Sequence, residues 1–80
     1  MHEAHLIKPI IKGISQHAQK EGARYVSKVR LKIGTLTAAK EDSFREAFLV
    51  LAKGTMLENA KLEITFFPGS RIEVVSFDIE

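Results

Sequence analysis

The sequence predicts a two-layer α+β domain in which two helices pack on one face of a three-stranded sheet, in the order helix-strand-helix-strand-strand. Two segments carry apolar residues at helical spacing, and three others alternate apolar and polar residues. No linker or low-complexity tract interrupts the 80 residues, and 45% of them are hydrophobic. We therefore expect a single globular domain spanning residues 1–80.

The first helix is predicted from apolar residues that recur at helical spacing between Leu6 and Ala18, with lysines on the opposite side. Gly22 can adopt the left-handed conformation that ends a helix. Because proline is tolerated in the first turn, Pro9 places the start of a regular helix near His5 or Leu6. This start would leave the first four residues loosely held, and an upstream turn with a kink at Pro9 is the alternative.

Residues 25–37 alternate between apolar and basic side chains, which predicts a half-buried strand with a basic outer stripe. The stripe could contact nucleic acid, but acidic residues on the later strands can pair with it across the sheet. The aromatic-and-glycine motif of RNA-binding sheets is also missing, so nucleic-acid binding is not expected. The apolar face holds Val29, Leu31 and Ile33, the basic face holds Lys28, Arg30 and Lys32, and the acidic residues are Glu63, Glu73, Asp78 and Glu80.

A second amphipathic helix is predicted to begin at Asp42 or Ser43, because the stretch from Ser43 to Glu46 fits a capping box. Lys53 and Gly54 are expected to end it. Its buried stripe is expected to contain Phe44, Ala47, Phe48 and Leu51.

Two further strands are predicted at residues 61–67 and 71–79. Residues 68–70 (Pro-Gly-Ser) suggest a tight turn that joins them as an antiparallel hairpin. Together with a right-handed crossover through the second helix, this hairpin would place the last strand between the other two. The alternation changes phase between Val74 and Val75, which predicts a bulge or a local twist there. The expected core contains Phe44, Phe48, Phe66, Phe77 and the isoleucines of the first helix.

The composition excludes several classes of function. The chain has no cysteine, so neither disulfides nor a thiolate zinc site is expected. No glycine-rich phosphate loop or serine-histidine-acid pattern is present, and we do not expect an enzyme. No apolar run reaches membrane-spanning length and no signal sequence is visible, which predicts a cytoplasmic protein without membrane association. Self-association into a homo-oligomer would bury further surface in so short a chain.

The first residues, Met1-His2-Glu3, form a candidate metal site. The α-amine, the His2 imidazole and the intervening backbone amide can close fused chelate rings on one ion. A tetragonal set of nitrogen ligands favours Ni(II) or Cu(II) over Zn(II). The ordinary pKa is about 8 for an α-amine and about 6.5 for an imidazole, so binding would depend on pH near neutrality. His5 lies three residues after His2 and, with Glu3, could supply a further ligand. The alternative is a frayed terminus without a function.

Several stretches are similar to a known family. They are Met1-His2-Glu3, the helix that ends in Glu21-Gly22-Ala23, and residues 29–36, 44–48, 53–64 and 69–80. In this order they cover nearly the whole chain, which resembles the HypA/HybF family of nickel metallochaperones. The resemblance implies delivery of Ni(II) during maturation of nickel-iron hydrogenase and, in some bacteria, urease. It also implies that the ligands are the amine of Met1, the imidazole of His2 and the backbone nitrogens of His2 and Glu3. The implied partners are a HypB-like GTPase and the precursor of the target metalloenzyme.

The chain departs from this family in one large feature. Family members carry a zinc domain with two Cys-x-x-Cys pairs between their last two strands, whereas residues 68–70 close that gap here. The zinc domain is therefore expected to be absent, in a minimal paralogue, an engineered deletion or a relative that has lost metal delivery. We expect a nickel-binding accessory protein that holds Ni(II) at its N-terminus. The alternative is a metal-free protein-interaction module that keeps the fold.

Overall fold

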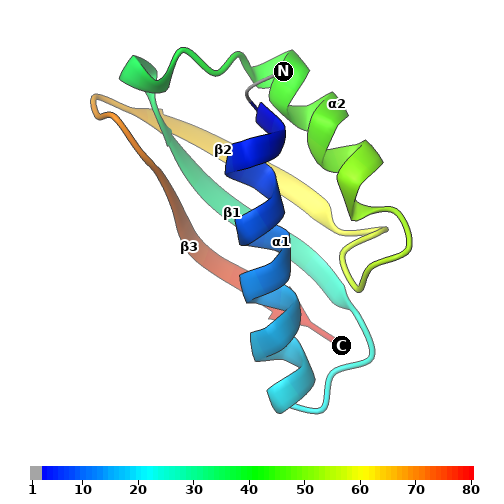
Figure 1. The fold of residues 1–80 in the computed structure, drawn as a ribbon. Coiled ribbons are helices and arrows are strands. Elements are labelled where there is room, and N and C mark those ends of the chain that lie inside the picture. The colour runs from blue at the N-terminus through cyan, green and yellow to red at the C-terminus, as the bar shows by residue number, and fades with distance from the viewer. Residues whose placement is uncertain (1–2) are drawn as a thin grey trace.

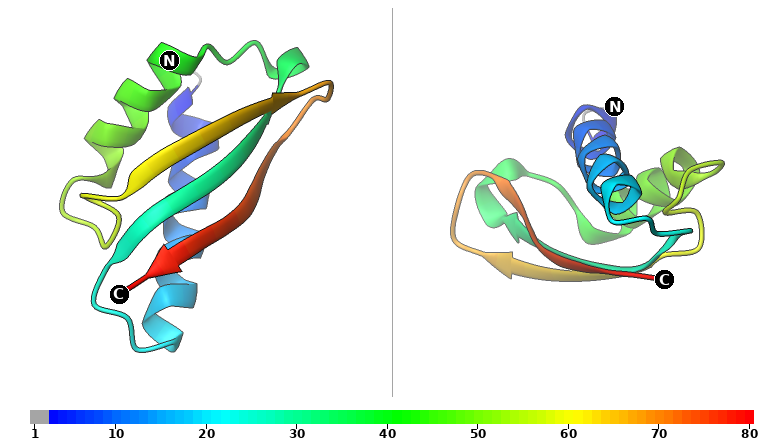
Figure 2. Two further views of the ribbon diagram at one scale, coloured as in Figure 1. Left: turned by 180° about the vertical axis from the view of Figure 1, so that it is seen from behind. Right: turned by 90° about the horizontal axis from the view of Figure 1, so that it is seen from below.

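A computed structural model describes residues 3–80 and contains two helices and three strands in the predicted order (Figure 1). Both helices lie on one face of the sheet (Figure 2). The two-layer α+β fold is therefore confirmed. Neither helix of the described chain is long and apolar enough to cross a membrane. The elements are α1 (Glu3–Lys20), β1 (Val26–Gly34), the 3₁₀ turn η1 (Thr35–Thr37), α2 (Glu41–Ala52), β2 (Lys61–Phe67) and β3 (Ile72–Ile79).

The order of the strands differs from the prediction. The sheet runs β2-β1-β3, with β1 parallel to β2 and antiparallel to β3, so the predicted hairpin between the last two strands is wrong. β1 lies at the centre of the sheet because its helix-facing side is more apolar than that of β2 or β3. Its buried side chains include Val26, Val29, Leu31 and Ile33, whereas no side chain of β2 or β3 is fully buried.

Residues 68–71 cross the end of β1 instead of folding back as a hairpin. The backbone N–H of Gly34 donates to the carbonyl of Arg71, and that of Leu36 donates to the carbonyl of Gly69, both at 2.8 Å. A Cβ atom at position 34 would collide with the carbonyl oxygen of Gly69. Glycine is therefore needed at position 34 for this close approach. The strand predicted to reach Thr37 ends at Gly34, where η1 begins beneath the crossing segment.

The predicted bulge in the last strand is confirmed. Arg30 is opposite Ser76 and Leu31 is opposite Val74, so Val75 has no partner on β1. The extra residue switches which alternate positions of β3 face the helices.

The first helix begins earlier than predicted. α1 starts at Glu3 and continues through Pro9. The upstream turn of the alternative is therefore present, and the expectation that Glu3 and Ala4 are loosely held is wrong. Pro9 removes one backbone hydrogen bond to the carbonyl of His5. Packing compensates, because Ala4 lines a hollow against α2 and the buried face of the helix continues one turn later at Ile7.

The second helix also begins earlier than predicted. Lys40 is its N-cap residue and makes no side-chain capping bond, so the capping box at Ser43 is wrong. An ion pair joins Arg45 Nε to Glu41 Oε2 at 3.0 Å, and acidic side chains in the first turn complement the helix dipole. The helix ends at Ala52, with Lys53 as its C-cap residue and Gly54 at a φ of 78°, so the predicted termination at Lys53 and Gly54 is confirmed.

The core lies between the helices and β1. Phe44 and Phe48 are buried as predicted, and Phe77 is partly buried against the core. Phe66 is 39% exposed, because β2 is an edge strand, and its predicted place in the core is wrong. Leu57, in the turn after α2, is also part of the core. The N–H of Val26 donates a hydrogen bond to the carbonyl of Met56 and so holds this turn against β1. The buried residues are Ile7, Ile11, Ile14, Ala18, Val26, Val29, Leu31, Ile33, Phe44, Ala47, Phe48, Ala52 and Leu57.

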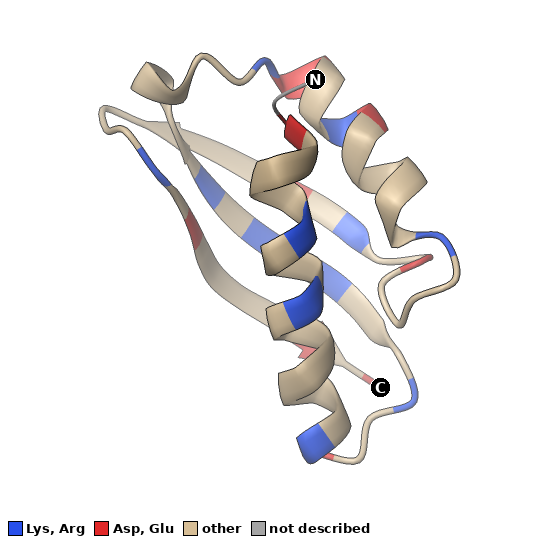
Figure 3. Cartoon of the chain, in the orientation of Figure 1, with Lys and Arg blue, Asp and Glu red and all other residues tan. Residues whose placement is uncertain are grey.

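An ion-pair network crosses the solvent-facing side of the sheet, where basic segments of β1 lie between acidic segments of the edge strands (Figure 3). Arg30 donates two hydrogen bonds to the carboxylate of Asp78, at 3.0 and 3.1 Å, which lowers the pKa of Asp78. Lys28 lies 2.9 Å from Glu63 and lowers the pKa of that carboxyl group. The predicted pairing is thus confirmed for these two acids.

Glu73 does not take part in this network. Its carboxylate accepts a hydrogen bond from Arg71 Nε at 2.8 Å, within the same strand region. Lys32 is exposed and lies opposite Glu73 in the register without forming an ion pair in the described chain.

We predict that Phe44→Ala destabilises the fold by about 3–5 kcal/mol, because it removes a fully buried aromatic side chain and leaves a cavity. Leu49→Ala on the same helix, where the side chain is 61% exposed, should change stability by no more than about 0.5 kcal/mol. Urea unfolding followed by circular dichroism measures both. Equal effects would contradict this placement of α2.

We also predict that stability falls in acid. Because folding lowers the pKa of both Asp78 and Glu63, their contribution is present at neutral pH and is lost as pH falls below the ordinary carboxyl values of about 4. Asp78→Asn should reduce this pH dependence, and salt should weaken it because the groups are exposed. The midpoint of urea unfolding, measured from about pH 7 to about pH 3, tests this loss of stability.

Candidate metal centre

The predicted ligands lie at the start of the chain. Met1 and His2 fall outside the residues that the structure describes, and Glu3 and His5 fall within them. Glu3 is the first residue of α1 and is half-buried, whereas His5, two residues later, is exposed.

The backbone nitrogen of Glu3 remains available for a metal even though the helix begins there. The first N–H groups of an α-helix have no acceptor within the helix, and Glu3 opens α1. The earlier helix start therefore does not consume this predicted backbone ligand. The side chain of Glu3 has a separate role, because a carboxylate in the first turn interacts favourably with the positive end of the helix dipole.

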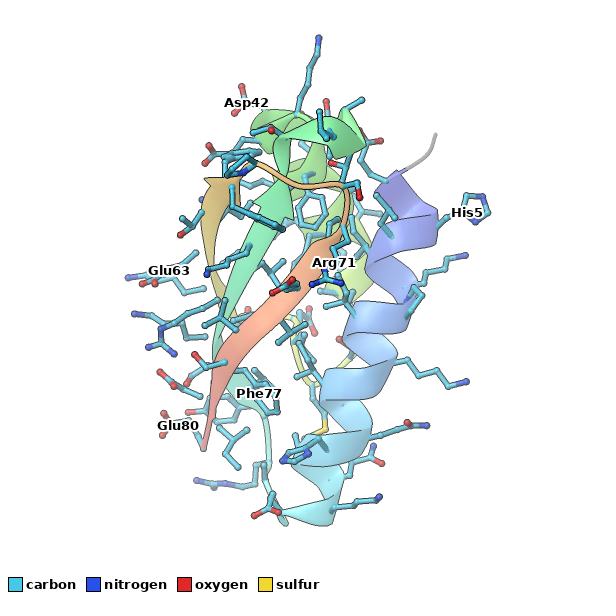
Figure 4. All side chains as sticks on the ribbon, turned by 90° about the vertical axis from the view of Figure 1, so that its left-hand side faces the viewer. His5, Asp42, Glu63, Arg71, Phe77 and Glu80 are labelled. Carbon is cyan, nitrogen blue, oxygen red and sulfur yellow. The ribbon has the colours of Figure 1, made fainter. Side chains whose placement is uncertain are left out.

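His5 is not brought together with the Glu3 side chain. Glu3 and His5 are two positions apart, which is about 200° of rotation around an α-helix, so their side chains leave opposite sides of α1. The His5 ring points away from the body of the protein (Figure 4). Within residues 3–80, no three His, Asp or Glu side chains form a cluster that could hold a metal ion.

An open hollow of about 290 Å³ lies beside the first turn of α1. It is mainly apolar, with Ser43 and Glu46 as the polar residues of its lining. Sequence reasoning missed it because its walls come from two helices separated along the chain. A usable signal was Val50, an apolar residue outside the predicted buried stripe of the second helix. The lining residues are Ala4, Ser43, Glu46, Ala47, Val50 and Leu51.

The basic stripe of β1 is a weaker candidate for a binding site. The charges of Lys28 and Arg30 are already matched by Glu63 and Asp78, so an added polyanion would have to displace two carboxylates. His17 is also occupied, because its ring packs edge-on against Phe77 with the centroids 5.4 Å apart.

The amino-acid sequence matches a family model described as "Hydrogenase/urease nickel incorporation, metallochaperone, hypA" over residues 1–72. The chain is 39% identical over 72 residues to the hydrogenase maturation factor HypA of Legionella pneumophila (strain Corby), covering 90% of this chain and 64% of the relative. It is 41% identical over 69 residues to the HypA of Nostoc punctiforme, covering 86% of this chain and 58% of the relative. The chain thus spans about three-fifths of the length of these relatives.

The fold is also found among solved structures. It matches the solution structure of the Ni metallochaperone HypA from Helicobacter pylori with a TM-score of 0.84 at 18% identity, covering 99% of this chain and 97% of that one. This likeness concerns the fold, and the match over residues 1–72 concerns the sequence. Together they lead to one assignment: the chain belongs to the HypA family of hydrogenase and urease nickel-incorporation proteins.

Proposed function

We propose that this protein binds Ni(II) at Met1-His2-Glu3 and passes the ion to the precursor of a nickel enzyme such as hydrogenase. The observation that carries the proposal is the family match, which starts at residue 1 and therefore includes the whole tripeptide. The proposed ligands are the α-amine, the His2 imidazole and the backbone nitrogens of His2 and Glu3.

The electrostatics of a helix start limit how nickel can be held there. The N-terminal end of α1 carries partial positive charge, which opposes a bound cation. Loss of amide protons would offset this, because each deprotonated backbone nitrogen brings a negative charge to the ion. The half-buried Glu3 carboxylate, in the same first turn, adds to that compensation. A site that depends on amide ionisation binds reversibly with pH, which suits a carrier that must release its ion.

The hollow between α1 and α2 is suited to be the surface on which the receiving protein docks. It adjoins the first turn of α1, and Val50 at its rim is 64% exposed. A partner seated on this apolar surface, a HypB-like GTPase or the enzyme precursor, would lie next to the metal-bearing residues. The Glu46 carboxylate in the lining would then lie close to an exchanging cation.

We predict that His2→Ala weakens Ni(II) binding at least about tenfold, because it removes the imidazole ligand. His17→Ala provides the matched control, since it removes an imidazole that packs against Phe77 and should leave nickel affinity unchanged. Isothermal titration of Ni(II) into untagged protein measures both. Equal weak binding by the parent and His2→Ala would favour the metal-free interaction module instead.

We further predict that acetylation of the α-amine, or one extra residue before Met1, weakens Ni(II) binding as His2→Ala does. Either change removes or displaces the terminal amine from the chelate. Binding by the unmodified protein should also decrease as pH falls below about 6.5, because the imidazole becomes protonated. Visible absorption of the nickel complex during pH titration tests this. Full binding by the acetylated protein would exclude a terminal chelate.

A further inference from the structure

The two edge strands of the sheet differ in how their backbone is covered. On β2, Arg45 donates from Nη1 to the carbonyl of Leu62 at 2.7 Å, and Glu41 holds the guanidinium in place. In β3, the carbonyl of Asp78 accepts a hydrogen bond from the Ser27 hydroxyl. It is the only main-chain group of β3 that a side chain of the described residues binds, and Ser27 belongs to the inner neighbour β1. β2 is thus closed by a charged side chain, whereas the outer edge of β3 remains open to another strand.

β3 also exposes apolar side chains where edge strands usually carry charge. Val74 is 41% exposed, Val75 is 56% exposed and Ile79 is 37% exposed. An open hollow of about 390 Å³ runs between this strand and α1, with Ile10, Gly13 and Phe77 among its lining residues. In Figure 4, Phe77 lies on the side of β3 that faces α1, as its contact with the His17 ring requires. A strand added to β3 would therefore meet an apolar surface as well as free backbone groups.

The bulge at Val75 makes β3 complementary to itself. Ile72 and Val74 lie opposite the buried Ile33 and Leu31, and Phe77 and Ile79 lie opposite the buried Val29 and Val26. All four of these β3 residues therefore face the helices, although two are even-numbered and two are odd-numbered. In a strand without a bulge, these two pairs would face opposite sides of the sheet.

We infer that β3 is the surface on which two copies of this chain associate, with the two β3 strands antiparallel in one continuous six-stranded sheet. A two-fold axis between Val75 and Ser76 places Ile72 opposite Ile79 and Val74 opposite Phe77, all on the helix side. Because the interface is isologous, each of these pairs occurs twice. The two α1 helices then lie on the same face, and the hollow beside each β3 is closed by the other copy.

The same register matches charge on the outer face. Arg71 lies opposite Glu80 of the second copy, and the pair is repeated by the symmetry. Glu73 lies opposite Asp78 of the second copy, and these two residues carry charges of the same sign. Each of these acids has an arginine of its own chain, Arg71 at 2.8 Å for Glu73 and Arg30 at 3.0 Å for Asp78, so the repulsion is reduced.

This association goes beyond the proposed nickel function and leaves it free to operate. The first turn of α1 lies against α2, on the side of the molecule away from the β3 edge (Figure 1). The first turn of each α1 therefore remains outside the paired strands. Loss of nickel binding in His2→Ala should not alter the dimer, so the two hypotheses fail separately.

The test is sedimentation velocity of the full, metal-free chain from micromolar to millimolar concentration. We expect a concentration-dependent equilibrium between a 9.0 kDa monomer and a dimer. Val75→Lys should raise the dimer dissociation constant at least about 100-fold, because two lysines would meet near the two-fold axis. Leu49→Lys, which also places a lysine at an exposed apolar site but on α2 (61% exposed), is the control and should have no effect.

A charge exchange at the ends of β3 provides a second readout that leaves the sequence of the bulge unchanged. Arg71→Glu and Glu80→Arg should each weaken the dimer. The double variant should bind more tightly than either single variant, because the cross-strand pairs reform with reversed sign, although Arg71 no longer offsets Glu73. Circular dichroism verifies that each variant is folded. A monomer at every concentration, a dimer that Val75→Lys leaves intact, or a double variant that binds no more tightly than either single variant would overturn the inference.

Discussion

The structure depends on covering the apolar face of β1. Its helix-facing side chains are almost completely buried, and both helices pack over them. This constraint explains why β1 occupies the centre of the sheet and why the less buried strands are at its edges. It also explains why α1 extends through Pro9, because continued packing of its buried face outweighs the loss of one backbone hydrogen bond. The polar side of the sheet is then left to ion pairs between the strands.

Periodic patterns allowed most elements to be predicted, because each pattern depends on local geometry alone. The bounds of β2 and the bulge at Val75 agree with the sequence analysis. The strand order could not be predicted this way, since a Pro-Gly-Ser segment fits a hairpin turn and also fits a crossing over Gly34. The start of α1 was missed for a related reason: contact with α2 stabilises a turn that local propensity disfavours. Phe66 shows that alternation identifies a face of a strand but not its depth in the sheet.

The candidate site combines what could be predicted with what could not. Chelate chemistry and the family resemblance both pointed to Met1-His2-Glu3 from the residues alone. The hollow between α1 and α2, in contrast, exists only because two distant segments meet. The proposed function needs both: a terminus that can bind an ion, and a neighbouring surface on which a second protein can approach it. The turn that forms the contact with α2 also carries Glu3, so the helix start links the two.

The path of residues 68–71 has a consequence for how this architecture can change. β2 and β3 are separated by β1 and share no hydrogen-bonded register, so the length of the segment between them does not determine how either strand pairs. Replacing Gly69 and Ser70 with a folded module would cost mainly the one backbone bond to Leu36, while the ladders on both sides of β1 remained. The domain is thus suited to gaining or losing a whole module at this point during evolution. It can equally serve as a scaffold for modules grafted in the laboratory.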